Sequence, residues 1–158
     1  IPHVRYYTND TWDTISAGRP LSGGTNGFPF LLRGKYSQGN IYVLAVPEDF
    51  SDLYELPDGV LNQMRAIFTK DLKVRIEGPA KVSLFVYDNN TFIVESFLDE
   101  PVDIKVLAPK ESTQIVDLVS GEKIGCDKPA VEGPWRMPQQ SSTWSLTLQP
   151  HTYRVFSF

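Results

Sequence analysis

The acidic residues have the clearest catalytic potential in this sequence, because two carboxylates held across a cleft are enough to hydrolyse a glycosidic bond. Glu95 stands out among them, since it lies inside the largely apolar stretch of residues 92–97. A carboxylate buried in such surroundings has a raised pKa and can serve as a general acid. The alternative is that Glu95 lies on the wet face of a strand, and this is the interpretation we favour.

Metal-binding and nucleophilic chemistry find little support in the other polar residues. The two histidines, His3 and His151, have no neighbouring ligand at metal-binding spacing. Cys126 is the one cysteine of the chain, so it can form neither an internal disulfide nor a thiolate metal site. The glycine-rich run of residues 18–27 lacks the spacings of the nucleotide-binding motifs. The sequence therefore predicts no metal and no cofactor.

Aromatic side chains in polar loops are better candidates for a binding surface. Such rings are costly to leave in water, so they either pack onto a core or contact a ligand. Sugar rings have an apolar face that stacks on aromatic rings, and a neighbouring guanidinium suits hydroxyls or a uronate carboxylate. The candidate carbohydrate-binding residues are Trp135, Arg136, Trp12 and Tyr7. Packing of these rings is the alternative interpretation, whereas Trp144 alternates with Leu146 and Leu148 and is assigned to the core.

The elements that position these side chains follow from hydrophobic periodicity. The spacing of apolar residues predicts an amphipathic helix over residues 58–69, whose apolar stripe ends at Phe68 and excludes Asn62 and Arg65. The run of residues 41–46 is almost entirely apolar, which predicts a strand buried on both faces. After the helix the period changes to two, which is typical of half-buried strands. The predicted strands cover residues 82–87, 92–97, 102–106, 115–119, 144–148 and 153–156.

Short strands separated by turns predict an antiparallel β-sandwich. We therefore expect a mainly β protein, in which a loop-rich strand–helix segment of residues 1–72 packs on a sandwich of residues 73–158. The chain has 158 residues, of which 41% are hydrophobic, and this suffices for such a core and excludes a disordered chain. Its net charge of -4 gives no basic footprint for nucleic acid, and no apolar run is long enough to cross a membrane.

Two sequence motifs near the C-terminus, called phrases below, resemble motifs of a known family. Residues 117–122, Asp-Leu-Val-Ser-Gly-Glu, look like the "D-h-h-S/T-G" strand and turn of the C-terminal β-sandwich domains of bacterial glycoside hydrolases. Residues 146–156 are similar to the closing "L-x-L-x-P-x-x-x-R-V-F" hairpin of the same domains. In α-amylase-like and β-galactosidase-like enzymes such a domain follows a catalytic barrel and does not carry the catalytic acid. Residues 39–68 depart from this pattern, because they look like a strand–helix unit similar to pieces of amidotransferase-like domains.

The resemblance implies a non-catalytic C-terminal accessory module of a bacterial carbohydrate-active protein, which supports a catalytic partner domain upstream in the parent chain. It also implies a periplasmic or secreted location. The alternative function is a carbohydrate-binding module that acts through the loop aromatics. A small glycoside hydrolase that uses Glu95 is the hypothesis with the least support.

Overall fold

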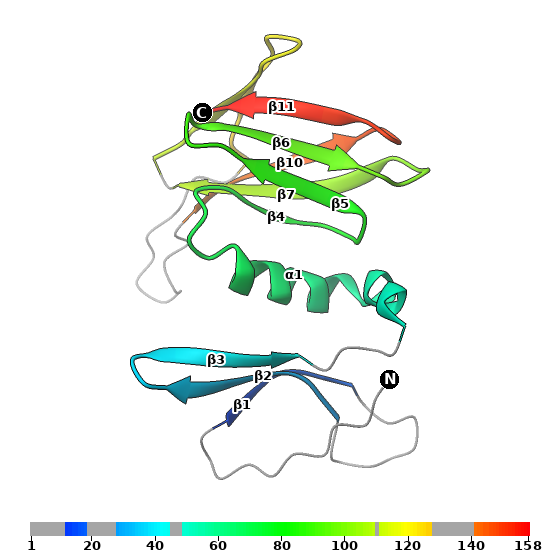
Figure 1. Cartoon of the computed structure of the whole chain (residues 1–158). Helices are drawn as coiled ribbons and strands as arrows, with labels where there is room; N and C mark the ends of the chain where they lie inside the picture. Colours follow the sequence, from blue (N-terminus) through cyan, green and yellow to red (C-terminus); the bar gives the residue numbers. More distant parts are fainter. Residues whose placement is uncertain (1–11, 19–27, 45–48, 110, 128–140) are drawn as a thin grey trace. The chain divides into compact units, whose positions relative to one another are not determined.

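The computed structural model describes residues 12–18, 28–44, 49–109, 111–127 and 141–158. The chain is mainly β, with antiparallel sheets and an α-helix after the N-terminal strands, which confirms the predicted fold class (Figure 1). It divides into two compact units, residues 1–55 and residues 56–158, and each is described by itself. The division into domains 1–72 and 73–158 stays a prediction. Within the described ranges no helix is long and apolar enough to cross a membrane.

The N-terminal unit contains an antiparallel sheet with the strand order β1-β2-β3. A 3-10 helix, η1 (Phe50–Glu55), follows this sheet. A tight turn joins the second and third strands, and its Ser37 has a φ of 52°, which two-residue hairpin turns favour. The strands are β1 (Trp12–Gly18), β2 (Phe28–Tyr36) and β3 (Gly39–Leu44).

Two expectations for this unit are wrong. Trp12 begins strand β1, where the sequence predicts a polar loop, and a register irregularity around Ser16 breaks the alternation that would mark the strand. β3 is an edge strand rather than a strand buried on both faces, because it pairs with β2 alone. Ile41 and Val43 are accordingly 44% and 40% exposed.

The C-terminal unit is a sandwich of two antiparallel sheets that face each other (Figure 1). One sheet has the order β10-β7-β4, with strands β10 (Ser141–Leu148), β7 (Val102–Pro109) and β4 (Arg75–Glu77). The other has the order β5-β6-β11-β8-β9, with strands β5 (Val82–Val86), β6 (Thr91–Ser96), β11 (Tyr153–Ser157), β8 (Gln114–Asp117) and β9 (Lys123–Gly125).

The core of the sandwich is made of the alternate residues of both sheets that point inward. Trp144 of β10 is fully buried, which confirms its predicted place, and its Nε1 donates a 3.1 Å hydrogen bond to the Ile124 carbonyl in β9 of the opposite sheet. The other fully buried large apolar side chains are Phe92, Phe156, Ile115, Leu148, Val74, Val94 and Val106. Phe92 and Phe156 stack with their ring centroids 5.2 Å apart. Trp144 therefore links the two sheets.

Helix α1 (Asp58–Phe68) packs beside β4, and two polar side chains from outside the predicted apolar stripe form hydrogen bonds there. Arg65 donates to the carbonyls of Gly78 and Pro79 (2.7 Å) in the segment that connects β4 to β5, and to the carbonyl of Val82 (3.3 Å) at the start of β5. Asn62 Oδ1 accepts a 3.0 Å hydrogen bond from the Gly78 amide. The reason is that backbone carbonyls of a connecting segment need donors, and a guanidinium supplies five of them.

Four residues of the predicted stripe, Val60, Leu61, Met64 and Ile67, are half-buried, but the prediction is wrong for its last residue. Phe68 is 73% exposed, and no residue of α1 is fully buried. The hydrogen bonds of Arg65 and Asn62 therefore help to attach the helix to the sandwich.

Candidate functional site

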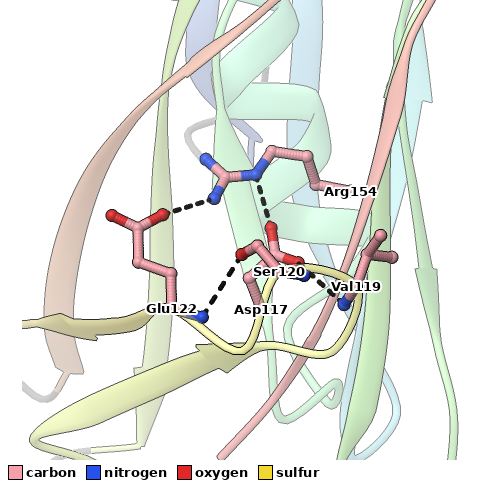
Figure 2. A network of polar contacts seen from close by, with 5 residues as sticks. All are labelled: Asp117, Val119, Ser120, Glu122 and Arg154. Atoms are coloured by element: carbon pink, nitrogen blue, oxygen red, sulfur yellow. Dashed lines mark hydrogen bonds and ion pairs between the residues drawn. The ribbon is translucent and has the colours of Figure 1, made fainter.

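The two sequence phrases that carry the family resemblance meet around Asp117 (Figure 2). Asp117 ends β8 and Arg154 lies in the neighbouring strand β11. The Arg154 Nε donates a 2.8 Å hydrogen bond to Asp117 Oδ2. This ion pair joins residues 37 positions apart in the sequence and fixes the turn after β8 to β11.

The residues after Asp117 form a turn that explains the "D-h-h-S-G" pattern. Asp117 Oδ1 accepts hydrogen bonds from the Val119 amide (2.9 Å) and the Ser120 amide (3.0 Å). The Gly121 amide donates to the Asp117 carbonyl at 2.8 Å, and Gly121 has a φ of +76°. Glycine adopts this backbone conformation at little cost, and aspartate is suited to accept from the amides that follow it.

A second carboxylate extends the network on the solvent side. Glu122 Oε2 accepts a 3.2 Å bond from Arg154 Nη2, and the Glu122 amide donates to Ser120 Oγ at 3.2 Å (Figure 2). The Arg154 guanidinium lies 4.9 Å from the centroid of the Phe156 ring, which is close enough for a cation–π contact. Arg154 thus contacts two carboxylates and one core ring.

The chemistry of Asp117 is that of a structural anion. Burial is the largest influence on its pKa and acts to raise it, but the hydrogen bonds from Ser120, Arg154 and Val119 and the charge of Arg154 together hold the pKa below its ordinary value. The carboxyl is therefore ionised at neutral pH and carries no proton for general acid catalysis. It is also only 4% exposed, so a polymeric substrate has no access to it.

Glu95, the candidate catalytic acid, lies on the outward-facing side of β6. The inward-facing neighbours Val94 and Ser96 are buried, whereas Glu95 is half-buried. Its cross-strand partners are Ser83 in β5 and Tyr153 in β11, and neither of them is a carboxylate. This arrangement agrees with the wet-face interpretation of Glu95.

Of the four predicted carbohydrate-binding residues, Trp12 lies in the described part of the structure. Trp135, Arg136 and Tyr7 lie outside the described residues. Trp12 opens β1, where its Cα is paired with that of Gly34. These residues stay predictions as a sugar-binding set.

The histidine and the cysteine of the C-terminal unit lie in ordinary structural surroundings. His151 is in the turn before β11, is exposed, and contacts Asp99 Oδ1 through Nε2 at 2.8 Å. Cys126 is half-buried, and its amide donates to the Thr113 carbonyl. Among the described residues no group of three histidine, cysteine, aspartate or glutamate side chains is placed to hold a metal ion.

A polar groove of about 430 Å³ crosses the outer face of the β10-β7-β4 sheet. Its charged and amide side chains are Glu77, Asp103, Lys105 and Asn62. Thr147 Oγ1 donates to Asp103 Oδ1 at 2.6 Å, and Glu77 and Lys105 are cross-strand partners. Sequence reasoning missed this groove because it gathers side chains from one helix and three strands, although the alternation in β7 already indicates that Asp103 and Lys105 face outward.

Comparison with known proteins gives one family. Residues 73–158 match the family described as "Probable glycosyl hydrolase, C-terminal domain". The matched range begins just before β4 and includes all strands of the sandwich. Neither a curated protein nor a solved structure matches the chain significantly.

Proposed function

The chain belongs to the family of probable glycosyl hydrolase C-terminal domains, and on this premise we propose that it is a non-catalytic accessory module that supports an upstream catalytic domain. The observation that carries the proposal is the family match over the complete sandwich. The "D-h-h-S-G" and "R-V-F" phrases lie within the matched range, and they form the Asp117–Arg154 pair of this sandwich. The role of such a module is to stabilise or orient the catalytic domain of the same parent protein.

Three carboxylates of the described sandwich, Asp117, Glu122 and Glu95, support a structural rather than a catalytic role. Glycoside hydrolysis needs two carboxyl groups about 5–10 Å apart on either side of a substrate, one of them protonated. Asp117 and Glu122 are instead both bonded to Arg154. Glu95 faces Ser83 and Tyr153 across the sheet.

We expect the chain alone to hydrolyse no glycoside. The measurement is a panel of aryl glycosides and polysaccharides, assayed with the wild type and with Glu95→Gln at equal concentrations. Rates equal to the enzyme-free blank for both proteins agree with the proposal. Turnover by the wild type that disappears in Glu95→Gln would show instead that this chain is a small hydrolase.

A second candidate function is carbohydrate binding, and the polar groove on the β10-β7-β4 sheet favours it. Carboxylates accept from sugar hydroxyls, while the ammonium of Lys105 and the amide of Asn62 donate to sugar oxygens. The groove volume of about 430 Å³ lies in the range of small-ligand sites. Trp135, Arg136, Trp12 and Tyr7 stay separate candidates for sugar contacts, predicted from the sequence. It requires a measurable affinity of the chain for free sugar, which the accessory role does not.

A further inference from the structure

A second groove, of about 370 Å³, lies on the same unit where the segment after α1 runs into β4. Three of its lining residues are cations, and none is an acid. The complete lining is Lys70, Leu72, Lys73, Arg75, Leu107, Ala108, Pro109 and Ser141. The groove is therefore locally positive, although the whole chain carries a net charge of -4.

The three cations differ in how they are held. Lys73 Nζ donates a 2.9 Å hydrogen bond to Asn90 Oδ1, which is a neutral acceptor. Lys70 is exposed and lies 4.0 Å from Asp71, which is more exposed still, and water screens this pair. Arg75 is half-buried, and its side chain has no hydrogen bond or ion pair with any other described residue. Its five donors are therefore available to a ligand.

Apolar groups line the groove beside these charges. Leu72 is 45% exposed, although leucine is usually buried. Leu107 lies directly across the strand pair from Arg75, and Ala108 and Pro109 continue along β7. The groove therefore offers an apolar surface next to a planar guanidinium and two ammonium groups.

We propose that this groove binds a uronate-bearing oligosaccharide, with the carboxylate on Arg75 and Lys73 and the apolar ring face against Leu72 and Leu107. A guanidinium matches a carboxylate in geometry and can hold it through two parallel hydrogen bonds. A neutral sugar gains only hydrogen bonds from these groups, whereas a uronate also gains charge attraction, so the charge complementarity favours an anionic sugar. This inference goes beyond both candidate functions, because it concerns a different groove, and it does not depend on the accessory role.

The polar groove at the other end of the sheet provides a natural comparison. It contains Glu77 and Asp103, whose negative charges repel a uronate, together with a single cation, Lys105. We therefore expect anionic sugars to bind the groove that contains Arg75, and neutral sugars to bind the polar groove.

The test is calorimetric titration of the chain with trigalacturonate and with galactotriose, which lacks the carboxylates. We expect trigalacturonate to bind, with an affinity that falls as the salt concentration rises, because exposed charges are screened over about 10 Å at 0.1 M salt. Arg75→Gln is expected to weaken binding about tenfold, the equivalent of one charge-assisted hydrogen bond. Lys123→Gln in β9, which also removes one positive charge but lies on the opposite sheet, is the matched control and leaves the affinity unchanged.

Thermal unfolding of each variant shows whether its fold is intact, and Lys73→Gln, at an exposed position, repeats the test if Arg75→Gln does not fold. Three results would overturn the proposal. The first is trigalacturonate binding no tighter than galactotriose. The second is equal affinity in Lys123→Gln and in folded Arg75→Gln or Lys73→Gln. The third is equal affinity for a tri-glutamate peptide, which would assign the groove to acidic peptides. None of these results bears on the accessory role, since the parent enzyme's stability is measured separately.

Discussion

Replacing Trp144 with alanine is expected to lower the free energy of unfolding by about 3–5 kcal/mol. The side chain is fully buried between the two sheets, so its removal leaves a large cavity in the centre of the sandwich. It also removes the hydrogen bond from Nε1 to the Ile124 carbonyl in the opposite sheet. Since small domains are stable by only about 5–15 kcal/mol, the loss is a large fraction of the total. Urea unfolding followed by circular dichroism at neutral pH measures it.

The control is Val119→Ala in the turn after β8. Val119 is 78% exposed, so its truncation is expected to change stability by less than about 0.5 kcal/mol. Unfolding midpoints for Trp144→Ala and Val119→Ala that differ by less than the experimental error would show that Trp144 is not a core residue.

Replacing Arg154 with methionine is expected to cost about 3 kcal/mol at pH 7, because the variant leaves a buried carboxylate without its cation. The side chains of Arg154 and Asp117 are 26% and 6% exposed, so solvent compensates little of the loss on the Asp117 side. Methionine keeps most of the length of the side chain and its packing on Phe156. The result is measured by urea unfolding, as for Trp144.

The cost of Arg154→Met is expected to shrink in acid. In the wild type the pKa of Asp117 is lower in the folded than in the unfolded state, so its contribution is complete above the ordinary aspartate pKa of about 3.9 and is lost as the pH falls through the lower, folded pKa. Removing Arg154 leaves the burial of Asp117 and takes away one bond and one charge that lower its pKa. The variant should therefore lose less stability than the wild type as the pH falls below about 4, so that the two free energies of unfolding converge in acid.

The double variant Asp117→Asn with Arg154→Met separates the pair from the turn. It removes the buried charge together with its partner, so it is expected to be less destabilised than the sum of the two single variants. Strict additivity, or a cost of Arg154→Met that does not depend on pH, would contradict a stabilising Asp117–Arg154 ion pair.

Much of the sandwich could be predicted because its strands are half-buried. In β6 the buried Phe92 and Val94 alternate with outward-facing residues, and in β7 the buried Ile104 and Val106 do the same. This alternation of apolar residues with a period of two is visible in the sequence. β4 and β9 have three residues each, which is too short to show a period. β1 was missed because an irregular register disturbs its alternation.

Contacts between distant residues could not be predicted from local pattern. The sequence phrases identify Asp117 and Arg154 as parts of separate turns and hairpins, but only the order of the sheet places β8 beside β11. Helix α1 illustrates the same point, since Asn62 and Arg65 are polar and therefore resemble solvent-facing residues. They bind Gly78 and its neighbours because that segment has free backbone groups, and no helical periodicity reveals them.

The candidate binding residues show most clearly what the sequence alone does not predict. Trp135, Arg136 and Tyr7 were chosen by residue type and lie outside the described part of the chain, so they stay predictions. The cationic groove was not predicted, because Lys70 and Lys73 resemble the solvated end of a helix. Their significance depends on Arg75 and Leu107, which the pairing of β4 with β7 brings beside them.

The accessory role is tested most directly by thermal inactivation of the parent glycosyl hydrolase that contains this sandwich, with Trp144→Phe in place of the wild-type residue. This milder change is expected to destabilise the sandwich by about 1–2 kcal/mol and leave it folded at low temperature. We expect the temperature of half-inactivation to fall by about 4 °C or more. We expect kcat/KM, measured at about 20 °C where the variant is folded, to change less than about twofold. An unchanged inactivation temperature, or a large loss of kcat/KM in the folded variant, would contradict a supporting, non-catalytic role.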